Sequence, residues 1–133
     1  MLQIFRVEHR DTRVGPFQTD SPFTQALAAR ANQRQQLKLP QDDGLLMGNL
    51  PFYFVFGCPS LDSLKAWILA GDVPAENRPV TEALAVEGFV VAEFLVEAED
   101  YRMGVSGLQV AFDADSCREE GLVVFHGMDA LLA

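Results

Sequence analysis

The sequence is poor in the residues that build metal sites and disulfide frameworks. It contains two cysteines, Cys58 and Cys117, and two histidines, His9 and His126. The cysteines lie 59 positions apart, which is not a metal-ligand spacing, and no neighbouring His or Asp completes a ligand set by spacing. We therefore expect no metal site, reduced thiols and a cytoplasmic location.

Long apolar runs are also missing. The longest, Leu50–Cys58 and Phe89–Ala92, fall far short of the ~20 residues that a membrane helix needs. The first residues are apolar, but Arg6, Glu8 and Arg10 interrupt them at once, which is not the pattern of a signal peptide. We therefore expect no membrane partner.

Basic residues are scarce, and they are unevenly distributed. Ten Lys and Arg stand against nineteen Asp and Glu, which gives a net charge of −9. Residues 1–40 carry six basic and three acidic residues, whereas residues 41–133 carry four basic and sixteen acidic ones. Such a field disfavours contact with nucleic acid and favours contact with basic protein surfaces. Solubility alone is the simpler explanation of the negative charge. Solubility and binding to a basic partner both remain open here.

The sequence does contain enough apolar residues for one core. Apolar residues make up 49% of the chain and ten are Phe, which excludes a disordered acidic chain. A length of 133 residues fits one domain, 1–133. Patterning predicts strands over residues 2–9, 52–56, 89–96, 108–112 and 121–126, with a turn over 97–102, and helices over 22–37, 60–71 and 79–87. We predict a single α+β domain of about five mostly antiparallel strands and two or three helices.

Three polar residues of the first predicted strand form a candidate site. On a strand, Arg6 and Glu8 project from one face about 7 Å apart, and His9 lies at the rim with its side chain on the other face. The guanidinium of Arg6 suits a phosphate or a carboxylate. The plainer alternative is an ion pair on the face of the strand.

Acidic residues in the later part of the chain form a candidate partner-binding surface. They are Glu93, Glu97, Glu99, Asp100, Asp113, Asp115, Glu119 and Glu120. Such an array can imitate nucleic-acid phosphates and occupy a basic groove, or it can simply protect strand edges from aggregation. The basic stripe of Arg30, Arg34 and Lys38 is interpreted as a solvated helix face, because the overall charge opposes direct nucleic-acid binding.

Several short motifs, taken in order, resemble a family of small phage and prophage proteins. The motifs are Phe5-Arg6-Val7-Glu8-His9, Gly15-Pro16-Phe17, Phe56-Gly57, Ser60-Leu61 with Leu64 and Trp67, Gly88-Phe89-Val90-Val91, and Gln109-Val110 with Phe112-Asp113. The resemblance spans about residues 4–113 and implies a phage protein. By analogy with anti-CRISPR proteins, it implies an inhibitor that binds a host defence protein or nucleoprotein complex, as a monomer or a homodimer.

A looser similarity to ADP-ribosyltransferase folds implies an enzymatic alternative with NAD as cofactor. Those folds place an Arg or His on an early strand, a Ser or Thr on a middle strand and a catalytic Glu late in the chain. The matching residues are Arg6, Ser60 and Gln109. Gln109 is not a carboxylate, so we expect no catalytic residues and no cofactor. A structural phage protein that self-associates is a third alternative.

Overall fold

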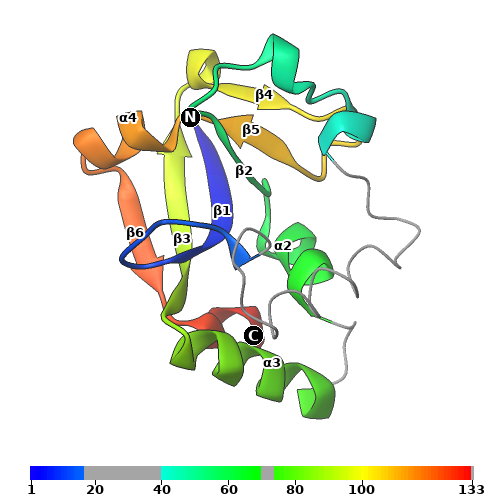
Figure 1. The fold of residues 1–133 in the computed structure, drawn as a ribbon, viewed down its shortest axis with the longest axis vertical. Coiled ribbons are helices and arrows are strands. Elements are labelled where there is room, and N and C mark those ends of the chain that lie inside the picture. The colour runs from blue at the N-terminus through cyan, green and yellow to red at the C-terminus, as the bar shows by residue number, and fades with distance from the viewer. Residues whose placement is uncertain (17–39, 70–73, 133) are drawn as a thin grey trace.

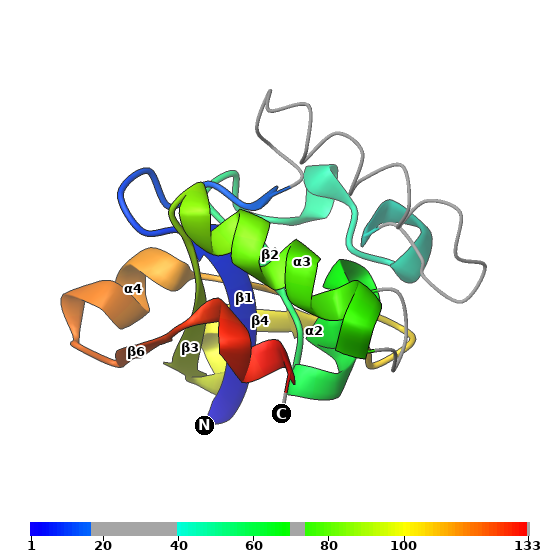
Figure 2. The same cartoon turned by 90° about the horizontal axis from the view of Figure 1, so that it is seen from below.

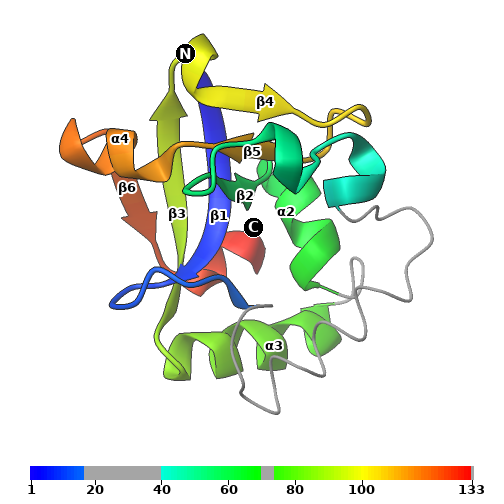
Figure 3. The same cartoon turned by 45° about the horizontal axis from the view of Figure 1, so that its top comes forward.

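Two three-stranded antiparallel sheets form the framework of the protein (Figure 1). The computed structural model describes residues 1–16, 40–69 and 74–132. The first sheet has the order β1-β3-β6, with β1 at Leu2–His9, β3 at Phe89–Val96 and β6 at Val123–His126. The second has the order β2-β5-β4, with β2 at Val55–Gly57, β5 at Val110–Phe112 and β4 at Tyr101–Met103. Figures 1 and 3 show the second sheet crossing the first.

Strand β1 connects the two sheets. It pairs with β3 along its whole length, from Leu2 opposite Val96 to His9 opposite Phe89. At its other edge the backbones of Phe5 and Cys58 exchange two hydrogen bonds of 2.8 Å each. Because Cys58 directly follows β2, these two bonds tie the second sheet to the first.

The core falls into two clusters on opposite faces of the first sheet. One cluster contains Val7 and Val91 and is covered by α2 at Leu61–Ile68, α3 at Pro74–Val86 and the 3-10 helix η5 at Met128–Leu132. Figure 2 shows η5 alongside α3. The other cluster contains Ile4 and Phe94 with residues of β5 and of α4, Ala114–Glu119. The alternation of β1 and β3 between the two faces follows the period-2 rule for strands.

The predicted α+β class is confirmed. The described residues contain six strands and three α-helices, besides short 3-10 helices η2 at Pro40–Asp43, η3 at Met47–Asn49 and η4 at Ala98–Asp100. The strands predicted over 2–9 and 89–96 match β1 and β3 residue for residue. The helix predicted over 22–37 and the stripe of Arg30, Arg34 and Lys38 lie outside the described residues.

The strand predicted over 52–56 was wrong at its start, because β2 begins only at Val55. The amide of Phe54 donates to the carbonyl of Pro51 at 3.1 Å, and this turn carries Phe52 and Tyr53 at its tip. Strand propensity mostly reflects packing against neighbours, and Phe52, at 90% exposed, has few neighbours. The strand also forms an edge of its sheet.

Two further predictions placed elements wrongly. The helix predicted over 79–87 begins at Pro74, so Pro79 lies inside α3 instead of starting it. A proline in a helix interior removes one backbone hydrogen bond. For this reason the sequence favoured a helix that starts at Pro79 over one that contains it. The turn predicted over 97–102 includes the beginning of β4, and α4 was not predicted. Segments of three and six residues are too short to show a hydrophobic period.

Candidate functional site

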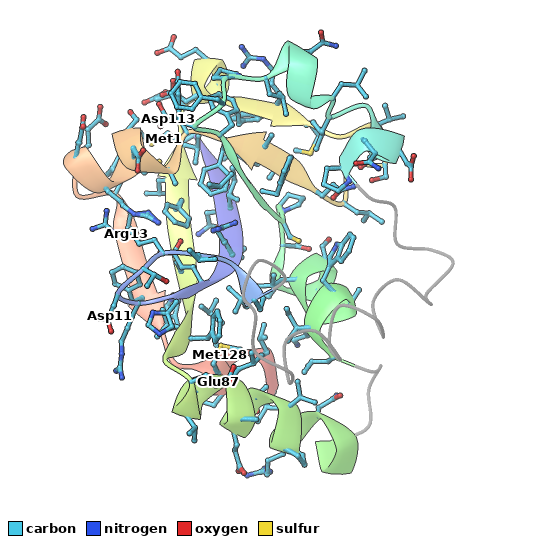
Figure 4. The ribbon with its side chains drawn as sticks, in the orientation of Figure 1. Met1, Asp11, Arg13, Glu87, Asp113 and Met128 are labelled. Carbon is cyan, nitrogen blue, oxygen red and sulfur yellow. The ribbon has the colours of Figure 1, made fainter. Side chains whose placement is uncertain are left out.

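Seven of the eight predicted acidic residues lie on two segments that meet at one end of the second sheet, η4 with the residue before it and α4 with its flanking residues. We call these seven residues the acidic corner. It comprises Glu97, Glu99, Asp100, Asp113, Asp115, Glu119 and Glu120. Tyr101 of β4 pairs with Phe112 of β5, so the segment before β4 and the segment after β5 meet at the same end. The amide of Asp113 donates to the carbonyl of Asp100 at 2.9 Å. Figure 4 labels Asp113 at the start of α4.

Some residues of the acidic corner stabilise local structure, and others do not. Asp113 caps α4, because its carboxylate accepts the amide of Ser116 at 3.1 Å. Glu97 begins η4 without any side-chain capping bond. Glu119 and Glu120 lie at the C-terminal end of α4, where a negative charge opposes the helix dipole. Helix stability therefore does not explain why positions 97, 119 and 120 carry acidic residues.

The negative field of the acidic corner acts on the buried thiol of Cys117. Burial, together with smaller contributions from the charges of Asp113, Asp100 and Glu120, raises the pKa of Cys117 to about 11. These three carboxylates come from both segments of the corner, so their charges act together at one point. The thiol itself donates to the carbonyl of Leu95 at 3.3 Å.

Glu93 lies outside the acidic corner. Along β3 it alternates with Phe94, and Phe94 faces the cluster that contains α4, so Glu93 points to the other face of the sheet. There its carboxylate lies 3.2 Å from Nε2 of His126 and accepts a hydrogen bond from the side-chain Nε2 of Gln3 at 3.4 Å. Glu93 is therefore the one predicted acidic residue that the structure places apart from the other seven.

A buried charged triad occupies the face of β1 that carries Arg6 and Glu8. Glu8 is 1% exposed. Its carboxylate accepts Nη2 of Arg118 at 2.7 and 2.9 Å and Nε of Arg6 at 3.3 Å. Strand geometry predicted the pair of Arg6 with Glu8. Arg118 was missed, because it lies 110 positions from Glu8 in the sequence.

The triad ties three parts of the chain together. Arg6 also donates to the carbonyls of Phe56 at 2.8 Å and Arg13 at 3.3 Å, and the guanidinium of Arg118 lies over the ring of Phe94 at 5.3 Å. Burial lowers the pKa of Arg6, while the charge of Glu8 acts in the opposite direction. Through Arg118, the triad holds α4, and with it part of the acidic corner, against β1.

His9 does not join the triad. Its Nδ1 accepts the amides of Asp11 at 3.1 Å and Thr12 at 3.3 Å, and its ring meets Phe89 edge to face at 5.5 Å. The histidine therefore anchors the turn after β1. In Figure 4, Asp11 and Arg13 mark this turn, well away from Asp113.

The three residues that match the ADP-ribosyltransferase pattern have separate partners. Arg6 belongs to the triad, and Oγ of Ser60 caps α2 by accepting the amide of Ser63 at 3.1 Å. Nε2 of Gln109 donates to Asp43 at 3.0 Å. None of these hydrogen bonds joins Arg6, Ser60 and Gln109 to one another. The absence of a cofactor stays a prediction, and the use of NAD stays its alternative.

Asp43 forms a buried polar cluster that sequence reasoning missed. Its carboxylate is fully buried. It accepts hydrogen bonds from the backbone amide and the hydroxyl of Ser106, both at 2.7 Å, and from the side-chain Nε2 of Gln109. A side chain on Gly104 would collide with this carboxylate. The cluster fixes η2 to the loop between β4 and β5. The sequence spacing between Asp43 and its partners gives no indication of this contact.

Comparison with known families decides the affiliation of the chain. The family model described as Bacteriophage T4 Y00F protein matches residues 1–125. The chain belongs to this phage protein family. No curated protein and no solved structure matches it. The match to the Y00F family confirms the resemblance to small phage proteins, and it covers the whole acidic corner and the whole triad.

Two further features of this Y00F family member concern metals and membranes. Within residues 1–16, 40–69 and 74–132, no three His, Cys, Asp or Glu side chains are grouped as metal ligands would be. In the same part of the chain, no helix combines the length and the apolar character of a bilayer-crossing segment.

Proposed function

We propose that this phage protein is a non-enzymatic inhibitor that binds a basic surface of a host defence complex of the CRISPR-Cas type. The acidic corner is the binding surface. The observation that carries this proposal is the meeting of the two acidic segments at one end of the second sheet, where the amide of Asp113 bonds to the carbonyl of Asp100 and the charges of Asp113, Asp100 and Glu120 act on one thiol. Dispersed acids would have favoured solubility as the explanation.

The chemistry of the acidic corner fits such a partner. Complexes that bind nucleic acid carry Lys and Arg side chains that contact phosphates. A group of carboxylates can occupy the same basic groove and exclude the nucleic acid. Complementary charges also accelerate encounter, and this effect weakens as salt shortens the screening length to about 8 Å at physiological ionic strength.

The test compares two variants that change the net charge equally. Glu97→Lys/Glu99→Lys reverses two exposed acids of the corner, neither of which makes a side-chain capping bond. The matched control, Asp11→Lys/Glu82→Lys, reverses two exposed acids in the turn after β1 and on α3. Circular dichroism establishes that both variants fold.

Binding to a purified CRISPR-Cas effector complex is then measured by biolayer interferometry at about 50 and about 500 mM salt. Each lost pair contributes about 0.2–1 kcal/mol, and each reversed charge adds a similar repulsion. These sum to about 0.8–4 kcal/mol, so we expect affinity about four- to several-hundredfold lower for the corner variant at low salt, a smaller difference at high salt and little change for the control. Equal weakening by both variants, or no binding by the unaltered protein, would contradict the proposal.

A further inference from the structure

An aromatic side chain stands almost fully in solvent on the turn before β2. Phe52 is 90% exposed and Tyr53 is 45% exposed. The two rings meet edge to face with centroids 5.5 Å apart, and Tyr53 meets Phe54 at the same distance. Single exposed apolar residues are common, but a supported row of three rings forms a continuous apolar surface.

This turn lies at the same end of the second sheet as the acidic corner. Val55 pairs with Phe112, and Asp113 follows Phe112 directly. In an antiparallel pair, the residues before Val55 therefore extend past the end where Asp113 lies. Figures 1 and 3 agree, since the segment entering β2 passes close to the start of α4 in both views.

We propose that Phe52 and Tyr53 are the apolar anchor of the acidic corner, and that the partner places an arginine side chain against the ring of Phe52. This inference rests on the proposed function and specifies the chemistry of the partner. The occupant is a cationic protein surface, because Asp113 and the Asp100 bonded to it lie at the same end of the second sheet as the aromatic turn. An arginine fits both features, since its planar guanidinium stacks on a ring while its charge faces carboxylates. Aromatic residues and Arg are also enriched at the centres of protein interfaces.

The experiment uses two synthetic peptides of alternating Arg-Gly and Lys-Gly as probes. Their binding to the full chain is measured by fluorescence anisotropy at low salt. Phe52→Leu removes the aromatic face and keeps apolar bulk. Phe125→Leu is the matched control, because Phe125 is another exposed ring, 57% exposed and borne by β6. Glu97→Lys/Glu99→Lys tests the charges in the same assay.

We expect the Arg-Gly peptide to bind more tightly than the Lys-Gly peptide. Phe52→Leu should weaken binding of the Arg-Gly peptide about two- to fivefold, whereas Phe125→Leu should not. If the charge reversal weakens binding and Phe52→Leu does not, the aromatic anchor is overturned while the proposed function stands. If Phe52→Leu weakens binding and the charge reversal does not, the acidic corner is overturned as the binding surface. Equal effects of Phe52→Leu and Phe125→Leu also overturn the anchor.

Discussion

Removal of the negative charge from the buried triad tests what holds α4 in place. In Glu8→Gln the guanidinium groups of Arg6 and Arg118 stay largely buried, and no carboxylate lies between them. Breaking a buried ion pair by removing one partner costs about 3–5 kcal/mol. Since whole domains are stable by about 5–15 kcal/mol, this loss should lower the melting temperature by roughly 10–20 °C.

A double-mutant cycle separates the charge effect from packing. Arg118→Met keeps a long side chain over Phe94 and leaves Glu8 paired with Arg6, so we expect a smaller loss of about 2–3 kcal/mol. The double variant Glu8→Gln/Arg118→Met no longer holds two unmatched cations. Its loss should therefore be smaller than the sum of the single losses by about 1–3 kcal/mol.

Urea unfolding followed by circular dichroism at pH 7 measures all four proteins of the cycle. A loss below about 1 kcal/mol for Glu8→Gln, or losses that simply add, would refute the reasoning. Either result would mean that water or neighbouring carbonyls compensate the two cations without Glu8.

Three further outcomes follow from the structure. Gly104→Ala should lower the free energy of unfolding by about 1–3 kcal/mol, because the added methyl meets the buried Asp43 carboxylate, whereas Gly48→Ala, with open space around it, should change little in the same urea assay. Burial raises the pKa of Cys58 from 9.0 to about 12, so stability should fall as pH rises above about 9, where only the unfolded thiol loses its proton; urea midpoints that rise between pH 8.5 and 10.5 would contradict this. Incubation with labelled NAD and host lysate should yield neither hydrolysis nor transfer, and either product would favour the ADP-ribosyltransferase-like alternative.

The sequence predicted the regular parts of the fold well, because local alternation decides them. The period-2 pattern of β1 placed Ile4, Arg6 and Glu8 on one face, and the structure pairs Arg6 with Glu8 as expected. The aromatic run before β2 was misread, since strand propensity does not distinguish an exposed turn from a covered strand. The turn becomes evident in the structure, where the amide of Phe54 donates to the carbonyl of Pro51.

The candidate site was predictable in its acids and not in its contacts. The composition located the acids in the later part of the chain, but their meeting depends on the register of β4 with β5. The same holds for Arg118, whose contact with Glu8 depends on how α4 packs, and for Asp43, whose partners lie more than sixty residues away. Long-range pairing of single polar residues leaves no periodic signal in one sequence.

The two hydrogen bonds between Phe5 and Cys58 have a consequence for how the protein opens. Strand β1 is bonded to β3 on one edge and to Cys58, directly after β2, on the other. The two sheets therefore cannot separate from each other without breaking the hydrogen bonds between Phe5 and Cys58. For this reason we expect the two sheets to unfold together as one cooperative unit, so that the amide protons of Phe5 and Cys58 exchange with solvent only through global unfolding. If the proposed partner binds the acidic corner, it should therefore stabilise both sheets together, because β1 joins them.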